Sequence, residues 1–415
     1  MTGYLQQRTL YPPQIQSKPS LNLGLVVVIP AYDEPFLLLS LMNLTKCTLP
    51  KCDVEVIIVI NESEKAPEDV IERNYQIAEQ TRLWIQKNNR PRLKFSILHH
   101  GLPPKHAGVG LARKIGMDEA CWRLEGARNP QGIIACFDAD SRCDENYFVA
   151  LENHFEQHPL CPACSIYFEH PLAGIDYDET IYQAIIQYEL HLRYYIHAQR
   201  YAGFPYAYHT VGSSMAVRCS AYQKQGGMNK RKAGEDFYFI HKFTLLPGFS
   251  ILKDTRVIPS ARPSHRVPFG TGRAVQEIIR QKGEYQTYAL ESFEELGSFL
   301  QLLPKFYEEG ITILDQHSST LLKSFLTIQQ FDQKLKELKK HSSSYSTFRN
   351  RFFYWFNAFM VMKYLHYARD NGRGEANVTQ AAYALLDQLE ISPATNDIRI
   401  LLNSYRKLDQ KPWKL

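Results

Sequence analysis

Short, mostly apolar runs recur along the first 140 residues of the chain. They occupy residues 23–29, 54–60, 93–98 and 132–137. The fully apolar, β-branched run at 23–29 is typical of a strand that is buried on both faces of a sheet, and the other three runs predict further strands. The intervening segments, residues 34–45, 67–87 and 108–123, place apolar side chains at helical spacing. Strands that alternate with helices predict βαβ units and a mostly parallel sheet.

The pattern changes further along the chain. A helix is predicted over residues 179–201, a strand of small residues within 206–218, a helix from Gly234 and a strand over 251–258. A loop rich in Arg, Pro and Gly follows, and from residue 276 onward apolar residues recur every three or four positions. We therefore expect a flexible lead-in over residues 1–20, an α/β domain over 21–275 and a helical region over 276–415.

Polar residues follow three of the predicted strands at the point where each strand ends. The first strand leads into Pro30-Ala31-Tyr32-Asp33-Glu34, the second into Asn61-Glu62 and the fourth into Asp138-Ala139-Asp140. In open α/β sheets, ligands bind beyond the carboxyl ends of the strands. We therefore expect these side chains to gather at one edge of the sheet.

Asp138 and Asp140 form a D-x-D pair directly after a buried strand. Hard divalent cations prefer oxygen ligands, and Mg²⁺ typically takes one or two carboxylates together with substrate phosphates. The alternative is an acidic pair in a loop without any ligand. The position of the pair after the strand favours the metal site.

Glu235 and Asp236 follow Gly234, where the sequence predicts the start of a helix. A carboxylate at this place is often only a cap, because the free backbone N–H groups attract negative charge. Two adjacent carboxylates cannot both be the cap. A general base that takes a proton from an acceptor hydroxyl is therefore an equal alternative.

Two further segments combine basic residues with glycines or prolines. Residues 105–113 (KHAGVGLAR) open a helix with a G-x-G, which can bring backbone N–H groups toward phosphate but does not match the full dinucleotide fingerprint. The loop 259–273 contains Arg262, His265, Arg266 and Arg273. Arginines bind diphosphates in bidentate fashion and histidine is a metal ligand, while a solvated basic loop is the alternative.

Composition narrows the class of protein. The 415-residue chain has a formal net charge of +5, 44% hydrophobic and 22% charged residues, as ordinary globular proteins do. So small a positive excess does not indicate a nucleic-acid partner. The single C-x-x-C, Cys161-Pro-Ala-Cys164, lacks a second pair at zinc spacing and is interpreted as reduced thiols. Without a signal-peptide pattern or an apolar stretch of about 18 residues, a cytoplasmic protein without a transmembrane segment is expected.

Taken in order, the segments PAYDEP, VEVIIVIN, GVGLARKIGMDEA, CFDADS and GED resemble the family 2 glycosyltransferases of the GT-A fold. The likeness spans residues 21–273, and the pairing of DAD with GED is its most specific part. It implies a GT-A (Rossmann-like) domain, a nucleotide-diphospho-sugar donor such as a UDP- or GDP-sugar, a Mn²⁺ or Mg²⁺ ion and inverting transfer in one displacement. The Q-x-x-R-W motif of processive members is absent, which favours a single-addition hexosyltransferase.

The resemblance also implies a donor site. Its nucleotide-contacting positions fall on Pro30, Ala31, Tyr32, Glu34, Asn61 and Arg113. Asn61 stands where the family often has an aspartate, which puts uridine specificity in doubt. Arg266 and Arg273 would contact the donor diphosphate, and Asp138 would face the ribose or the donor sugar.

The metal and the base follow from the same resemblance. Asp140 would hold the ion, with Asp138 beside it, and His265 resembles a late histidine that ligates metal in several GT-A enzymes. Asp236 is similar to the catalytic base, and Glu235 would support it or bind the acceptor. Which of these two carboxylates is the base stays open.

Two other functions also stay open. A sugar-phosphate nucleotidyltransferase has a related α/β core, but such enzymes usually carry a Gly-rich basic loop where this chain has PAYDEP. A non-catalytic GT-A module that binds sugars or partners would not need both acidic pairs. The expected partners are the nucleotide sugar and a carbohydrate or other hydroxyl-bearing acceptor, without nucleic acid. Peripheral membrane contact and a homo-oligomer are left open for the helical region.

Overall fold

The computed structural model describes residues 3–264, 266, 270–281, 283–314, 319–391, 393 and 395–412. The chain forms two compact units. Unit 1 comprises Met1–Tyr182 and Thr210–Gln276, and unit 2 comprises Gln183–His209 and Glu277–Leu415. The segment Gln183–His209 therefore belongs with the C-terminal part of the chain, whereas the sequence pattern alone had assigned it to the α/β domain.

Unit 1 is built on an eight-stranded sheet with the strand order β3-β2-β1-β4-β7-β6-β8-β5. The pairs β1–β2, β2–β3, β1–β4 and β6–β8 are parallel, and the pairs β4–β7, β6–β7 and β5–β8 are antiparallel. The strands are β1 (Leu23–Ala31), β2 (Asp53–Ser63), β3 (Leu93–Leu102), β4 (Ile133–Cys136), β5 (Arg142–Cys143), β6 (Ala163–Phe168), β7 (Met215–Arg218) and β8 (Ser250–Ile258). The expected α/β class, with a mixed, mostly parallel sheet, is confirmed.

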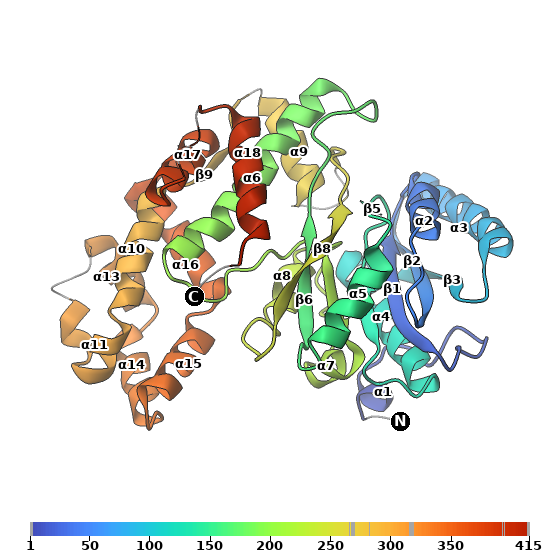
Figure 1. Cartoon of the computed structure of the whole chain (residues 1–415), viewed down its shortest axis with the longest axis horizontal. Coiled ribbons are helices and arrows are strands. Elements are labelled where there is room, and N and C mark those ends of the chain that lie inside the picture. Colours follow the sequence, from blue (N-terminus) through green and yellow to red (C-terminus); the bar gives the residue numbers. More distant parts are fainter. Residues whose placement is uncertain are drawn as a thin grey trace. The chain divides into compact units, whose positions relative to one another are not determined.

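Helices flank this sheet (Figure 1). They are α2 (Leu37–Thr45), α3 (Glu68–Asn88), α4 (Val109–Gly126), α5 (Tyr147–Gln157), α7 (Cys219–Lys224) and α8 (Glu235–Ile240). Helix α9 (Thr271–Gln281) begins in unit 1 and ends in unit 2. A Cβ atom at Gly116 of α4 would lie 2.4 Å from Cγ1 of Val28 in β1. The glycine therefore lets α4 approach β1 closely, which fixes the first turn of the helix relative to the strand ends.

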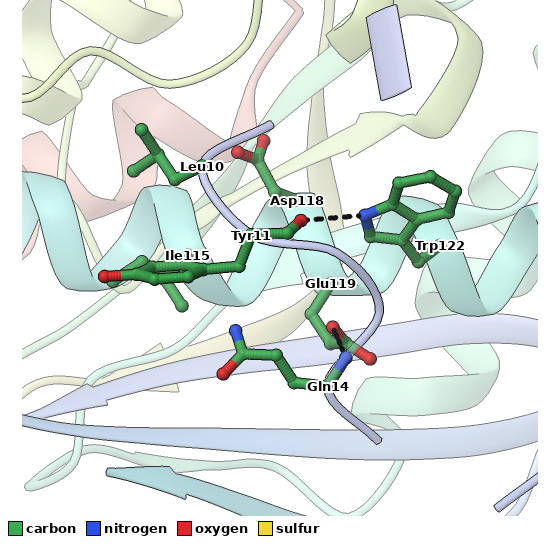
Figure 2. Close-up of a pocket in the computed structure, with 7 residues that line it drawn as sticks. All are labelled: Leu10, Tyr11, Gln14, Ile115, Asp118, Glu119 and Trp122. Carbon is green, nitrogen blue, oxygen red and sulfur yellow. Dashed lines mark hydrogen bonds between the residues drawn. The ribbon is translucent and has the colours of Figure 1, made fainter. Parts of the chain in front are cut away.

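The N-terminal segment packs against α4, although we expected a flexible lead-in. Gly3–Gln7 forms helix α1, and its Tyr4 and Leu5 are buried. Beyond α1, the backbone N–H groups of Gln14 and Ile15 donate to the Glu119 carboxylate at 2.9 and 3.0 Å. Figure 2 shows this segment crossing α4, and the gap left between them has no room for a water molecule.

Tyr4 is the main anchor of this segment. Its hydroxyl donates to Oδ1 of Asp118 on α4 at 2.8 Å, and the Tyr222 hydroxyl donates to the same oxygen at 2.8 Å. Lys114 lies 2.9 Å from Oδ2 of Asp118, so the buried carboxylate has a charged partner as well. At Gly227, which has a φ of +71°, a Cβ atom would collide with the Tyr4 hydroxyl. The N-terminal helix is therefore wedged between α4 and the turn that leads to α8.

Unit 2 is mostly helical, as expected for the C-terminal region. Its elements are α6 (Glu179–Tyr201, from Gln183 onward), α10 (Leu290–Gln301), α11 (Leu303–Glu308), the 3-10 turn η1 (Ile311–Ile313), α13 (Thr320–Ile328), α14 (Phe331–Lys340), α15 (Tyr345–Trp355), α16 (Ala358–Ala368), η2 (Arg369–Arg373), α17 (Val378–Gln388), α18 (Ile398–Gln410) and the hairpin of β9 (Gln286–Tyr288) and β10 (Glu375–Asn377). Phe299 packs against the rings of Phe306, Phe331, Phe352 and Phe356 at centroid separations of 5.4–5.9 Å. In the described part of the chain, no helix combines the length and apolarity needed to cross a bilayer.

A buried charge network joins α6 to α18, which lie side by side in Figure 1. Arg193 and His197 of α6 both donate to the Asp409 carboxylate. Burial alone would raise the pKa of Asp409, but His209, His197 and Arg193 hold it well below its usual range. This contact explains why the segment Gln183–His209 belongs with the C-terminal helices.

We predict that Tyr4→Ala lowers the free energy of unfolding by about 3–5 kcal/mol, because it removes a buried ring and a partner of Asp118. Tyr75→Ala is the matched control, since Tyr75 is 54% exposed on α3, and it should change stability by no more than about 0.5 kcal/mol. Urea unfolding followed by circular dichroism measures both. Equal stability of the two variants would show that the N-terminal segment is a free lead-in.

Candidate functional site

Asp138, Ala139 and Asp140 form a turn directly after β4. The hydroxyl of Ser40 in α2 donates to the Ala139 carbonyl at 2.9 Å, and the Ser141 N–H donates to the Asp138 carbonyl at 3.0 Å. These bonds hold the backbone of the turn. The carboxylates of Asp138 and Asp140 are thereby left for partners that come from elsewhere in unit 1.

Arg113, near the start of α4, joins the two acidic motifs. Its Nη2 donates to Oδ1 of Asp138 at 2.6 Å, and its Nη1 donates to Oε1 of Glu235. Only 2% of the Arg113 side chain and 4% of the Glu235 side chain are exposed. A buried charge is tolerated when it is paired, so each of these groups requires the other. Arg113, which was expected to contact the nucleotide, is thus paired with Asp138 and Glu235.

Gly212 completes the environment of this arginine. A Cβ atom at Gly212 would lie 2.9 Å from both terminal nitrogens of Arg113, so only a glycine lets the backbone rest on the guanidinium group. The burial of Glu235 raises the pKa of its carboxyl group, and Arg113 opposes that change. This role of Gly212 could not be predicted from the sequence, where it is only one of several small residues.

Asp236 lies at the start of α8, beside Glu235. Its Oδ1 accepts from the N–H of Phe237 at 2.7 Å, and its side chain is only partly buried. Burial and the neighbouring Glu235 carboxylate raise the pKa of Asp236 to about 7. Gly234 is the N-cap residue of α8, and as a glycine it has no side chain that could cap the helix. A carboxyl group with this pKa exchanges a proton near neutral pH.

Glu34 lies at the other side of the D-x-D turn. Its Oε2 accepts from both Arg262 and Arg266. The same two guanidinium groups lie 3.6 Å from Oδ2 of Asp140. Burial, followed by the charges of Glu34 and Asp138, raises the pKa of Asp140 to about 6, and the two arginines oppose the change.

These contacts form one continuous row, which we call the charged row. Its members in spatial order are Arg262 and Arg266 with Glu34, then Asp140, Asp138, Arg113, Glu235 and Asp236. The row has five carboxyl groups and three guanidinium groups, so its formal charge when fully ionised is −2. Burial is the first cause of the raised pKa values of Asp140 and Asp236, and this negative excess raises them further.

The residues expected to contact a nucleotide lie at the ends of β1 and β2. Pro30 and Ala31 are the last residues of β1 and are buried, so the loop itself begins at Tyr32. The Tyr32 carbonyl accepts from Nη1 of Arg266 at 3.1 Å, which links this loop to the charged row. Asn61 lies within β2 and is buried, close to the end of that strand.

A polar network beside Asn61 was not foreseen. Asn74 of α3 donates to the Asn61 carbonyl at 3.2 Å and to Oε2 of Glu62 at 2.9 Å, and it accepts from the N–H of Asp33 at 2.9 Å. His99 of β3 lies 2.9 Å from the same oxygen of Glu62. Asn74 is one polar residue within an amphipathic helix, so its position in the sequence carried no signal. Arg262 was likewise recognised only as part of a basic loop.

The loop at residues 259–273 was expected to contribute Arg266, Arg273 and His265 to the site. Arg266 joins the charged row, whereas Arg273 lies in the first turn of α9 with an exposed side chain. His265 lies outside the described residues. Within the described ranges, no group of three or more His, Cys, Asp or Glu side chains is arranged to hold a metal ion by itself.

The glycines of the G-x-G have a packing role. A Cβ atom at Gly108 would lie 2.9 Å from Cα of Lys232. At Gly110 it would lie 2.2 Å from the Arg231 carbonyl oxygen and 3.0 Å from Cβ of Glu235. Both glycines therefore admit the loop that precedes α8, and this close approach accounts for them without a bound phosphate.

Comparisons with known proteins find only distant likenesses. No family model matches the chain, and no curated protein matches it. Among solved structures, S. aureus TarS (residues 1–349) in complex with UDP-GlcNAc is 13% identical over 71% of this chain and 78% of that chain, with a TM-score of 0.40. The mannosyltransferase PcManGT from Pyrobaculum calidifontis, in complex with GDP-Man and Mn²⁺, is 14% identical over 98% and 92% of the two chains, with a TM-score of 0.37. Likenesses at these TM-scores do not assign an activity to this chain.

We predict that Asp140→Asn stabilises the protein above neutral pH. The pKa of this carboxyl group is about 6 in the folded chain and 3.8 ordinarily. The folded state therefore holds the proton more tightly, and the wild type loses stability as pH rises from about 4 to 6. In chelator, the variant should be about 1–3 kcal/mol more stable at pH 8 and unchanged at pH 3.5.

Urea unfolding at both pH values measures the effect. Asp387→Asn, which changes an exposed carboxylate on α17, is the matched control and should have no effect at either pH. A destabilised Asp140→Asn protein at pH 8 would show that the two arginines outweigh the negative neighbours of Asp140.

Proposed function

We propose that this protein is an inverting glycosyltransferase of the GT-A kind, which moves a hexose from a UDP- or GDP-sugar to an acceptor hydroxyl with the help of Mn²⁺ or Mg²⁺. The observation that carries the proposal is the charged row. Arg113 joins the D-x-D turn to the Glu235–Asp236 pair within one buried contact. Such an arrangement places groups suited to a diphosphate beside a carboxyl group suited to take a proton.

The chemistry of the residues fits a divalent cation. Asp140 offers a partly exposed carboxylate, and Glu34 and Asp138 add negative charge around it. Mg²⁺ usually binds one or two carboxylates and completes its shell with substrate phosphates and water, so a full protein cage is not required. Asp140 would hold the ion, with Asp138 beside it. A bound cation would neutralise the charge that grows on the diphosphate leaving group.

The donor end of the row is proposed to lie at Glu34. Arg262 and Arg266 present guanidinium groups between Glu34 and Asp140. Guanidinium groups bind phosphate oxygens in bidentate fashion, so these side chains can exchange a carboxylate partner for a diphosphate. The loop at Tyr32 and the end of β2 at Asn61 adjoin this end and would receive the nucleoside.

Asp236 is proposed as the general base. Its pKa of about 7 leaves much of it ionised at neutral pH, and the Phe237 N–H holds one of its oxygens. Glu235 is already engaged with Arg113 in a buried pair. We therefore assign Glu235 to positioning and Asp236 to proton removal from the acceptor hydroxyl, which takes place as the acceptor oxygen attacks the anomeric carbon.

The first test is donor binding. We expect a UDP- or GDP-sugar with Mn²⁺ to raise the melting temperature in a panel that also contains ADP- and dTDP-sugars, since a ligand at 100 times its Kd stabilises the native state by about 2.7 kcal/mol. Asp140→Ala should lose the part of the shift that depends on Mn²⁺, whereas Asp387→Ala should retain it. A Mn²⁺-dependent shift that persists in Asp140→Ala would remove this residue from the metal site.

The second test is proton removal. Asp236→Asn should keep the donor-induced thermal shift but release nucleoside diphosphate about 10²–10⁴ times more slowly in transfer assays. In the wild type, kcat/KM should rise with pH through about 7, because the base acts in its ionised form. Normal transfer by Asp236→Asn would exclude the base role. Release of pyrophosphate from a nucleoside triphosphate and a sugar phosphate would assign a nucleotidyltransferase instead.

A further inference from the structure

A basic loop directly precedes the proposed base. Lys230, Arg231 and Lys232 are consecutive and exposed, and they end two residues before Gly234. Lys105 is also exposed, in the loop before α4. We call these four residues the basic rim. No carboxylate among the described residues forms an ion pair with a rim side chain, so the positive charge of the rim is not neutralised there.

The basic rim has a defined place in unit 1. Gly108 and Gly110 at the start of α4 admit the backbone of Lys232 and Arg231 at distances that no larger residue would allow. The Arg231 guanidinium group lies 3.7 Å from the centroid of the Tyr238 ring on α8. A Cβ atom at Gly110 would meet both the Arg231 carbonyl oxygen and Cβ of Glu235, so the loop is folded back beside the carboxylate pair.

The rim and the other arginines lie toward opposite ends of the charged row. Arg262 and Arg266 contact Asp140 and Glu34, which are the proposed donor end. Lys230, Arg231 and Lys232 of the rim lie in the loop that leads into α8, whose Glu235 and Asp236 are the proposed acceptor end. Three adjacent cations without carboxylate partners repel one another, and a ligand of opposite charge relieves that repulsion. An anionic acceptor would supply that charge beside Asp236.

On the basis of the proposed function, we propose that the basic rim selects an anionic acceptor, a hydroxyl-bearing compound that carries phosphate or carboxylate groups close to the hydroxyl that receives the sugar. The anionic group contacts Lys230, Arg231 and Lys232, and the hydroxyl reaches Asp236. Specificity for the acceptor then arises from charge outside the charged row, while the donor occupies the arginines beside Asp140.

The test compares three probes with one backbone: dextran, carboxymethyl-dextran and dextran phosphate, with binding to the full-length protein measured by affinity electrophoresis. We expect one or both charged polymers to bind at least about tenfold more tightly than dextran, because each cation near the site adds a fraction of a kcal/mol. The triple variant K230Q/R231Q/K232Q should lose this preference. The two charged probes distinguish carboxylate from phosphate recognition.

A clustered control separates the rim from general electrostatics. K336Q/K339Q/K340Q removes three lysines from α14 in unit 2 and therefore changes net charge equally, and it should bind the charged polymers as the wild type does. Equal loss in both triple variants, or equal binding of dextran itself, would overturn the proposal. So would equally tight binding of a single-stranded oligonucleotide, which would indicate nucleic-acid binding.

Donor binding distinguishes failure of this inference from failure of the proposed function. The rim variant should keep the thermal shift with UDP- or GDP-sugar and Mn²⁺, and that shift also verifies its folding. Loss of the shift with unchanged urea unfolding would place the rim at the donor and overturn the proposal. If the wild type itself shows no shift with any nucleotide sugar, the proposed function fails, whereas a rim-dependent preference for charged dextrans would still identify the anion-binding surface.

Discussion

The buried pairing of Arg113 with Asp138 and Glu235 is the contact on which the rest of the site depends. It joins the turn after β4 to the start of α8, which lie about a hundred residues apart in the sequence. Removing the guanidinium group would leave Glu235 ionised without a partner in a buried place, which is more costly than never forming the pair. A side chain at position 110 would collide with the loop before α8, and one at position 212 would press on the Arg113 guanidinium group. Glycine at both positions leaves the room that this pairing requires.

The negative excess of the charged row lowers the stability of the folded state at neutral pH, although the proposed function requires it. Burial and neighbouring carboxylates raise the pKa of Asp140 to about 6 and that of Asp236 to about 7, so the folded chain holds protons that the unfolded chain would release. Ionising both groups costs folding free energy at neutral pH. Under the proposed function, the negative excess would attract the cation and would help Asp236 to take up the proton.

The sequence was informative about the parts of the fold that depend on local pattern. The apolar runs at β1, β2 and β4 matched the strands because a doubly buried strand needs apolar side chains on both faces. The candidate residues Asp138, Arg113 and Glu235 could be listed because each belongs to a short motif. Their contacts with one another could not be predicted, because the spacing between the motifs does not show which face of α4 packs against which turn.

Long-range packing accounts for what the sequence did not reveal. The bonds from Arg262 and Arg266 to Glu34 span 228 and 232 positions, so only the closed fold could select these two arginines from the four candidates in their loop. The grouping of Gln183–His209 with the C-terminal helices rests on Asp409, which is an ordinary acidic residue in a polar helix when read alone. Tyr4 likewise gains its role from Asp118 and Tyr222, far along the chain.

The positive charges around the site are divided between two places. Two anionic substrates that approach one another repel, and at a partly buried site this repulsion is screened less than in water. Cations placed only at the diphosphate would offset the charge of the donor alone. An anionic acceptor would then be repelled by the carboxylates of Asp236 and Asp138. The arginines beside Glu34 and the rim before Glu235 place positive charge at both ends of a negative row. Under the proposed function, this separation would give each substrate its own counter-charge, and it would leave Asp140 to bind the cation and Asp236 to accept the proton.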